Sequence, residues 1–231
     1  MVATDIVPEL LEKIKKDFSK NVRNSSKLKR IAKLVEEGNA SYSDANDYAI
    51  EIGELLSRSF RKFVTADVLP DGRMYYNIAE RILNDTLSNN HSLISVVTSK
   101  VQSELNIKSG FRIKGIAPAL SQDRIDGIIN RVSAEESFDD VKWILDEPVV
   151  NFSQSVVDDS IKENAEFHSK SGLHPTITRT VDRADACDWC KSIAGVFKYP
   201  EVPQDVYRRH DRCRCTVEYD PGDSKRKNIW S

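Results

Sequence analysis

The four cysteines of the chain are confined to positions 187–215 of a sequence of 231 residues. They form two close pairs, C-x2-C at Cys187 and Cys190 and C-x-C at Cys213 and Cys215. A C-x2-C pair at a turn brings two sulfur atoms onto one ion, with bonds of about 2.3 Å for zinc. Residues i and i+2 of a strand point to the same face, so the second pair can face the first. The spacing therefore predicts a single metal site.

His210 offers a fifth donor, because it lies three residues before Cys213. A tetrahedral site has four positions, and we expect all four cysteines to fill them. In the alternative, three cysteines bind with His210, which replaces Cys213 or Cys215. If His210 is not a ligand, we expect it to lie behind the ligands and to donate to a thiolate or a backbone carbonyl. We expect a structural Zn2+, because so small a segment cannot bury a core of its own.

Other uses of the cysteines stay open at this point. They can be reduced thiols buried without a metal, or they can serve redox or catalytic chemistry. A catalytic zinc needs an open position and a nearby base, for which Asp188 and Asp211 are available, although both are more typical of solvated turns. The first residues contain no apolar run long enough for a signal peptide or a membrane span. We therefore expect a reducing cytoplasm, where disulfides are rare.

The chain from position 5 to about 170 has the apolar periodicity of helices. Val7, Leu10, Ile14 and Phe18, for example, share one helix face. Further helices are expected around 28–35, 45–60, 75–82, 93–105, 121–132, 133–145 and 149–170. Gly172 is the expected end of the last one.

After Gly172 the sequence becomes rich in β-branched residues. Three strand-like runs, at 176–180, 196–199 and 215–219, predict a small antiparallel sheet around the cysteines. We therefore expect a mainly α fold with a small C-terminal α+β zinc-binding subdomain. The expected divisions are a helical N-terminal region (1–106), a helical middle region (107–172) and the zinc-stabilised subdomain (173–231).

The overall charge does not indicate a nucleic-acid-binding protein. The chain has 34 Lys and Arg residues against 36 Asp and Glu residues, a formal net charge of −2, so any nucleic-acid contact must come from local patches. The candidates are Lys13, Lys16, Lys20, Arg23, Lys27, Arg30, Arg208 and Arg209. Such residues can neutralise phosphates. The lysine-rich stripe can equally be a solvated helix face, and the arginines can offset the negative charge of a four-thiolate zinc centre.

A series of short motifs follows in a fixed order from Val150 to Trp230. They are NFSxSV and ENA (Asn151 to Ala165), GLxPTITRT (Gly172 to Thr180), ACDWCKSIAGVFKYP (Ala186 to Pro200), VYRRHDRCRCTVEYDPG (Val206 to Gly222) and KRKNIW (Lys225 to Trp230). In this order the chain resembles the C-terminal region of the minor head proteins, also called minor capsid or head morphogenesis proteins, of tailed phages of Gram-positive bacteria. The N-terminal part is similar to them only in being helical.

The resemblance implies a structural virion component, synthesised in the host cytoplasm and placed in the head interior or near the portal. It implies three partners: the portal protein, a major capsid or scaffold protein, and packaged double-stranded DNA. It implies no membrane. The implied role is in head assembly, with DNA ejection as a further stage at which such a protein acts.

We therefore expect a structural protein rather than an enzyme. The sequence contains no Walker loop, no Gly-rich dinucleotide motif and no Ser-His-Asp order. One alternative is a head-associated nuclease-like or other effector enzyme, in which His210, Asp211 and the neighbouring arginines form an acid–base and phosphate-binding cluster. Another is a zinc-containing nucleic-acid-binding protein, against which the near-neutral charge argues.

Overall fold

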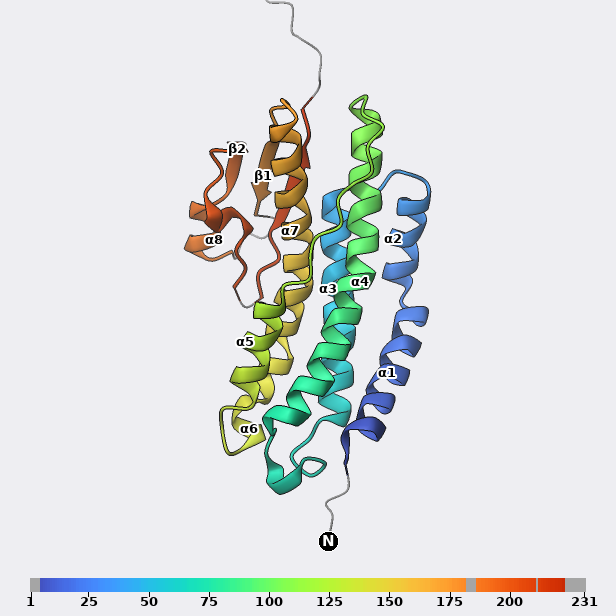
Figure 1. Cartoon of the computed structure of the whole chain (residues 1–231), viewed down its shortest axis with the longest axis vertical. Coiled ribbons are helices and arrows are strands. Elements are labelled where there is room, and N and C mark those ends of the chain that lie inside the picture. The colour runs from blue at the N-terminus through green and yellow to red at the C-terminus, as the bar shows by residue number, and fades with distance from the viewer. Residues whose placement is uncertain (1–4, 182–185, 211, 223–231) are drawn as a thin grey trace, which may run out of the picture.

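The computed structural model of the protein describes residues 5–181, 186–210 and 212–222. Helices make up 65% of the described residues and strands 7%, so the mainly α fold with a small C-terminal α+β region is confirmed. The long helices run side by side along the long axis, and the sheet and α8 lie against one side of α7 (Figure 1). None of the helices in the described residues combines the length and apolarity needed to cross a membrane.

The elements fall into a helical bundle and a C-terminal part. The bundle helices are α1 (Val7–Asn24), α2 (Ser26–Glu36), α3 (Tyr42–Phe63), α4 (Tyr76–Lys108), α5 (Gln122–Val132) and α7 (Glu147–Lys170). Short helical turns lie between them at η1 (Pro70–Gly72), α6 (Phe138–Val141) and η2 (Lys142–Leu145). The C-terminal elements are β1 (Thr176–Thr180), α8 (Asp188–Ser192), β2 (Gly195–Lys198), η3 (Gln204–Tyr207) and β3 (Thr216–Asp220).

The apolar periodicity of the sequence explains the outer helices. The four periodic residues of α1 are buried, and the side chain of Ile14 is fully covered. The start of α3 is fixed by a reciprocal capping box, in which Ser41 Oγ accepts from the Asp44 amide (3.2 Å) and the Asp44 carboxylate accepts from the Ser41 amide (3.0 Å). Local sequence therefore sets where this central helix begins.

The long helix α4 differs from what the sequence suggested. Two helices were expected at 75–82 and 93–105, but this expectation is wrong, because one unbroken helix spans 33 residues. The middle of this helix has a buried face that the expected division missed, because Leu83 and Leu87 are buried there. Asn90 on the same stretch is also buried, and its side-chain amide donates to Ser153 of α7 (3.3 Å). Packing against α7 thus accommodates a polar residue in the middle of the helix.

The centre of the bundle is the contact of α7 with α3 and α4. Gly53 lets α3 and α7 approach closely, since a Cβ at this position would lie 2.8 Å from the Cα of Val150. The hydrophobic core runs without a break from α1 to the sheet, where it includes Ile177 and Tyr219. The C-terminal part is therefore anchored on the bundle.

The sheet has three antiparallel strands in the order β2-β1-β3. Ile177 of β1 lies opposite Phe197 of β2 and Tyr219 of β3. The alternation of β3 buries Val217 and Tyr219 against the bundle, because this strand packs on α3 and α7. The three expected strands are thus present, each within one residue of its expected bounds.

Candidate metal centre

The first cysteine pair is held by a single turn of helix. Cys187 is the N-cap residue of α8, and its sulfur accepts a hydrogen bond from the amide of Cys190 at 3.4 Å. Cys187 is exposed and Cys190 is buried, with 2% of its surface exposed. The C-x2-C spacing therefore places both sulfur atoms on one side of the turn, with Cys187 at the solvent edge.

The second group of donors comes from the segment between η3 and β3. The amide of Cys213 donates to the carbonyl of His210 (3.0 Å), which closes a turn and brings the imidazole back beside the cysteines. Cys213 and Cys215 precede β3, which begins at Thr216, rather than lying within a strand. Both thiols are nevertheless buried in the same cluster as Cys190.

All five predicted donors come together. His210 Nε2 lies 2.9 Å from the sulfur of Cys190 and 3.4 Å from that of Cys187, and the sulfurs of Cys190 and Cys213 are 3.9 Å apart. The donors form two trios that share Cys190, one with Cys187 and His210 and one with Cys213 and Cys215. Tetrahedral zinc with bonds of about 2.3 Å needs sulfur–sulfur separations of about 3.8 Å. The cluster can therefore hold a metal ion.

A fully buried arginine, Arg179 of β1, also belongs to this centre. Its guanidinium donates to the sulfur of Cys213 (3.5 Å) and to the carbonyl of Arg208 (3.0 Å), and it lies over the ring of Trp189. Sequence reasoning did not assign it a role. The signal was present in β1, because strand alternation puts Arg179 on the same buried face as Ile177.

The surrounding groups make Cys213 the most acidic thiol of the cluster. A hydrogen bond from Cys215, supported by the positive charges of Arg209 and Arg179, lowers the pKa of Cys213 to about 4. The same hydrogen bond, together with burial, raises the pKa of Cys215. Burial raises the pKa of Cys190 as well. Among these thiols, Cys213 is therefore the one that loses its proton most readily, and Cys215 is its hydrogen-bond donor.

Arg209 is buried behind the cysteines rather than exposed to solvent. Its guanidinium donates to both carboxylate oxygens of Asp158 at 2.7 Å, and it also contacts the carbonyl of Cys215. The side chains of Arg209 and Asp158 are 3% and 1% exposed. The expected role of Arg209 in nucleic-acid binding needs correction, because its guanidinium is enclosed and already paired.

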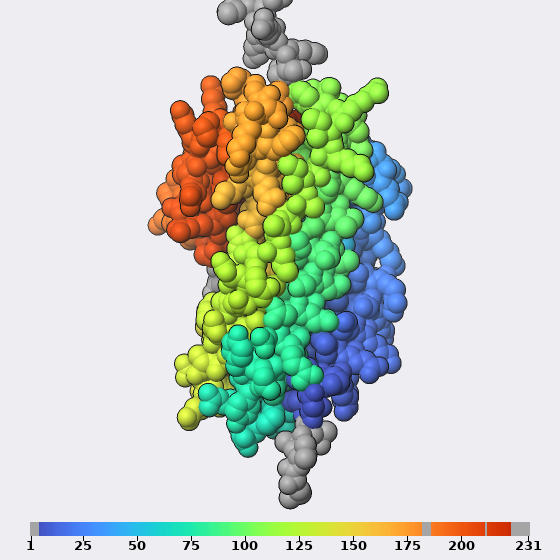
Figure 2. All heavy atoms as spheres, in the orientation of Figure 1, coloured from blue at the N-terminus to red at the C-terminus, as the bar shows by residue number. Residues whose placement is uncertain are grey.

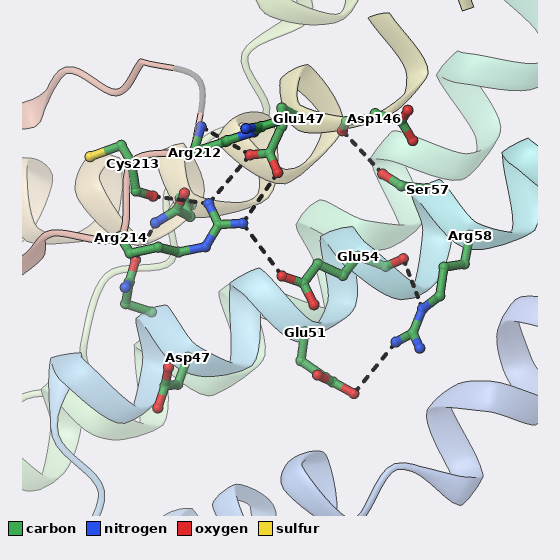
Figure 3. Close-up of polar contacts among 12 residues, drawn as sticks. Asp47, Glu51, Glu54, Ser57, Arg58, Asp146, Glu147, Arg212, Cys213 and Arg214 are labelled. Atoms are coloured by element: carbon green, nitrogen blue, oxygen red, sulfur yellow. Dashed lines mark hydrogen bonds and ion pairs between the residues drawn. The ribbon is translucent and has the colours of Figure 1, made fainter. Parts of the chain in front are cut away.

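A second arginine, Arg214, ties the cysteine loop to the bundle (Figure 3). Its guanidinium reaches both oxygens of Glu147 at 3.3 Å and Glu54 of α3 at 3.4 Å. The amide of Arg212 also donates to Glu147 (3.0 Å). The residues on both sides of Cys213 are thus bound to the first turn of α7, and Arg214 is also bound to the middle of α3.

The basic candidates of α1 and α2 lie away from the metal centre. α1 and α2, which carry the stripe, are on the side of the bundle opposite to the C-terminal part (Figure 2). Ion pairs in this stripe are Lys13–Glu9 (2.6 Å), Lys27–Asp47 (3.1 Å) and Arg30–Asp44 (3.8 Å). Lys16, Lys20 and Arg23 are exposed and have no ion-pair partner among the residues that the structure describes. Arg208 is exposed beside the metal centre, where it pairs with Asp205 (3.0 Å).

The described residues expected to form an acid–base cluster in an enzyme already have other partners or lie apart from one another. His210 Nε2 lies between two sulfur atoms, and Arg209 is committed to Asp158. Asp188 is exposed at the start of α8, while Asp211 and the KRKNIW motif lie outside the described residues. The geometry of the described part therefore favours metal binding over acid–base chemistry.

Comparisons with known proteins gave no match. No family model, no curated protein and no solved structure is similar to the chain at a significant level. The assignment of the centre consequently rests on its own geometry, and the resemblance to phage minor head proteins rests on the order of the sequence motifs.

Proposed function

We propose that the protein is a structural minor head protein of a tailed phage, and that one zinc ion holds α8 and the loop before β3 together within its C-terminal part. The observation that carries the zinc proposal is the position of His210 Nε2, within 3.4 Å of the sulfurs of both Cys187 and Cys190. The support for the head-protein proposal is that the cysteine-containing motifs behind the resemblance converge on one compact site.

Charge balance favours His210 as the fourth ligand. Arg179 and Arg209 are buried with a single carboxylate, Asp158, which leaves one positive charge to be offset. Zn2+ with three thiolates and a neutral histidine carries one net negative charge, whereas four thiolates leave two. We therefore favour the alternative set of Cys187, Cys190, His210 and Cys213, with Cys215 as a hydrogen-bond donor to Cys213.

The ion would act on the fold rather than on a substrate. When bound, zinc supplies strong bonds between segments that share little apolar surface. The loop that carries the cysteines would then be held in a fixed position on the bundle, because Arg209 bonds Asp158 of α7 and Arg214 bonds Glu147 and Glu54. The metal centre would thus fix the surface that the C-terminal part presents to the portal, to a capsid or scaffold protein, or to packaged DNA.

Metal content of purified variants tests this proposal. We expect about one zinc per wild-type chain, no zinc in Cys187→Ser, strongly weakened binding in His210→Ala, and full content in Cys215→Ser. Zinc retained in His210→Ala and lost in Cys215→Ser would establish the four-cysteine site instead. A wild-type chain without metal and with four freely titratable thiols would overturn the zinc proposal.

The head-protein proposal needs a separate experiment. If the gene is disrupted in its phage, we expect heads that are assembled incompletely or are not infectious, and mass spectrometry should find the protein in purified wild-type virions. Absence of the protein from virions would contradict the proposal and leave the metal centre unaffected.

A further inference from the structure

A groove of about 540 Å³ lies between α5, the first turns of α7 and the loop that carries His210. Three exposed arginines line it, Arg124 and Arg131 from α5 and Arg208 from the loop. None of the described residues that line the groove is acidic. In a chain with a net charge of −2, this is a local concentration of positive charge.

One face of α5 forms a wall of the groove. This face consists of Arg124, Gly127, Ile128 and Arg131, which are spaced i, i+3, i+4 and i+7. Gly127 keeps its middle open, because an added Cβ would meet no atom within 4 Å. The floor is apolar, since Ile128 of α5 and Pro148 and Phe152 of α7 line it. The groove therefore combines a cationic rim with an apolar base.

Two of the rim arginines have acidic partners. Arg124 pairs with Asp159 through both of its terminal nitrogens, and Arg208 pairs with Asp205 (3.0 Å). Both pairs are partly exposed, so an incoming anion can compete for the guanidinium groups, more readily at Arg208 than at the bidentate Arg124. Arg131 lies 5.1 Å from the ring centre of Trp143 and has no acidic partner in the part of the chain that the structure describes. These cations are thus available to a ligand.

We propose that the groove binds a single-stranded nucleic acid, with phosphates on the arginines and a base on the apolar floor. Guanidinium groups bind phosphate oxygens in bidentate fashion. Aromatic and apolar surfaces accept a base of any sequence. Tyr207 lines the groove and is partly exposed, whereas Phe152 is almost fully covered. The ring of Tyr207 favours a nucleotide over an acidic peptide, which the same cations could otherwise attract.

This inference rests on the proposed function in one respect, because the metal centre fixes the wall that contains Arg208 and His210. The two proposals can fail separately. Metal content measured on every sample shows whether the centre is intact, and nucleic-acid binding then reports on the groove alone.

The test uses the full zinc-loaded chain and the fluorescence anisotropy of a labelled oligothymidylate of about twelve nucleotides at low salt. The double variant Arg124→Gln/Arg131→Gln should bind about tenfold or more weakly. Its salt dependence should also become shallower, by about 1.4 in the slope of log K against log salt for two lost phosphate contacts. The matched control is Lys16→Gln/Lys20→Gln, which removes the same charge from the opposite side of the bundle and should change the affinity less than about twofold.

A second pair of variants separates the groove from charge alone. Gly127→Trp leaves every arginine in place but fills the groove, so it should weaken binding, whereas Gly127→Ala should bind like the wild type. The proposal would be overturned if the arginine and the lysine double variants lost equal amounts of affinity, or if the wild type did not bind the oligonucleotide. Equally effective competition by a duplex or by oligoglutamate of similar charge would overturn it as well.

Discussion

The helical bundle and the cysteine-containing part are held together by different chemistry. The bundle has one continuous apolar core that starts in α1 and extends to the inner face of β1 and β3. The buried cluster beyond that face consists of Cys190, Cys213 and Cys215, with Arg179 and the Arg209–Asp158 pair beside it. The boundary therefore runs through the sheet. On one side burial of apolar surface supplies stability; on the other side we propose that stability depends on a metal ion and on paired charges.

The largest effect is expected from Cys190→Ser, because Cys190 belongs to both donor trios. Structural zinc contributes about 10–16 kcal/mol of apparent binding free energy in small domains, and much of this should be lost. We expect rapid proteolysis within 186–215 while circular dichroism still reports the helical content of the bundle. Cys215→Ser is the control and should retain both the metal and the resistance of this segment to proteolysis. Collapse of the whole helical signal in Cys190→Ser would break the distinction between the two regions.

The next effect concerns neighbouring carboxylates on α7. Asp158→Asn leaves the buried guanidinium of Arg209 without its counter-charge, which should cost about 3–5 kcal/mol. Asp159→Asn removes only the partner of the partly exposed Arg124 and should cost about 0–1 kcal/mol. Urea unfolding followed by circular dichroism measures both. Similar losses in the two variants would show that the buried pair does not dock the cysteine loop.

Shortening a buried apolar side chain of the bundle tests whether the bundle can be destabilised without loss of the metal. Ile52 is fully buried on α3, so Ile52→Ala should lower the free energy of unfolding by about 2–5 kcal/mol. Val96→Ala, at an exposed position of α4, should change it by about 0.5 kcal/mol or less. Neither variant should alter the metal content under native conditions. Zinc lost from folded Ile52→Ala would mean that the centre depends on the packing of the bundle.

The smallest effect is expected at helix starts. Ser41→Ala removes the capping box of α3 and should cost about 1 kcal/mol. Ser121→Ala is the control, because Ser121 occupies the N-cap of α5 without a side-chain hydrogen bond. Its cost should be a few tenths of a kcal/mol. Equal costs in thermal unfolding would show that the capping bonds of Ser41 do not stabilise α3.

Much of this architecture could be predicted from local sequence. Apolar periodicity located α1, and the cysteine pairs with His210 located the candidate metal cluster. These predictions were correct because each depends on residues that lie close together in the chain. The same is true of the end of α7, where Gly172 follows the C-cap Ser171 and has a φ of 84°.

What could not be predicted depends on contacts between distant segments. The middle of α4 carries a buried Asn90 that bonds Ser153 of α7, and the burial of Arg209 depends on Asp158, which lies about fifty residues earlier. Nothing in the local sequence distinguishes the buried Arg209 from its exposed neighbour Arg208. Charge pairing across the fold therefore decided which basic residues face solvent.

Hydrogen exchange of the zinc-loaded and the chelated protein tests the central claim most directly. Amides in α8 and in residues 204–215 should lose their protection when zinc is removed, while those of α3, α4 and α7 should keep theirs. Unchanged protection around the cysteines would contradict a structural role for the metal. Loss of protection throughout the bundle would contradict the division of the molecule into an apolar part and a metal-dependent part.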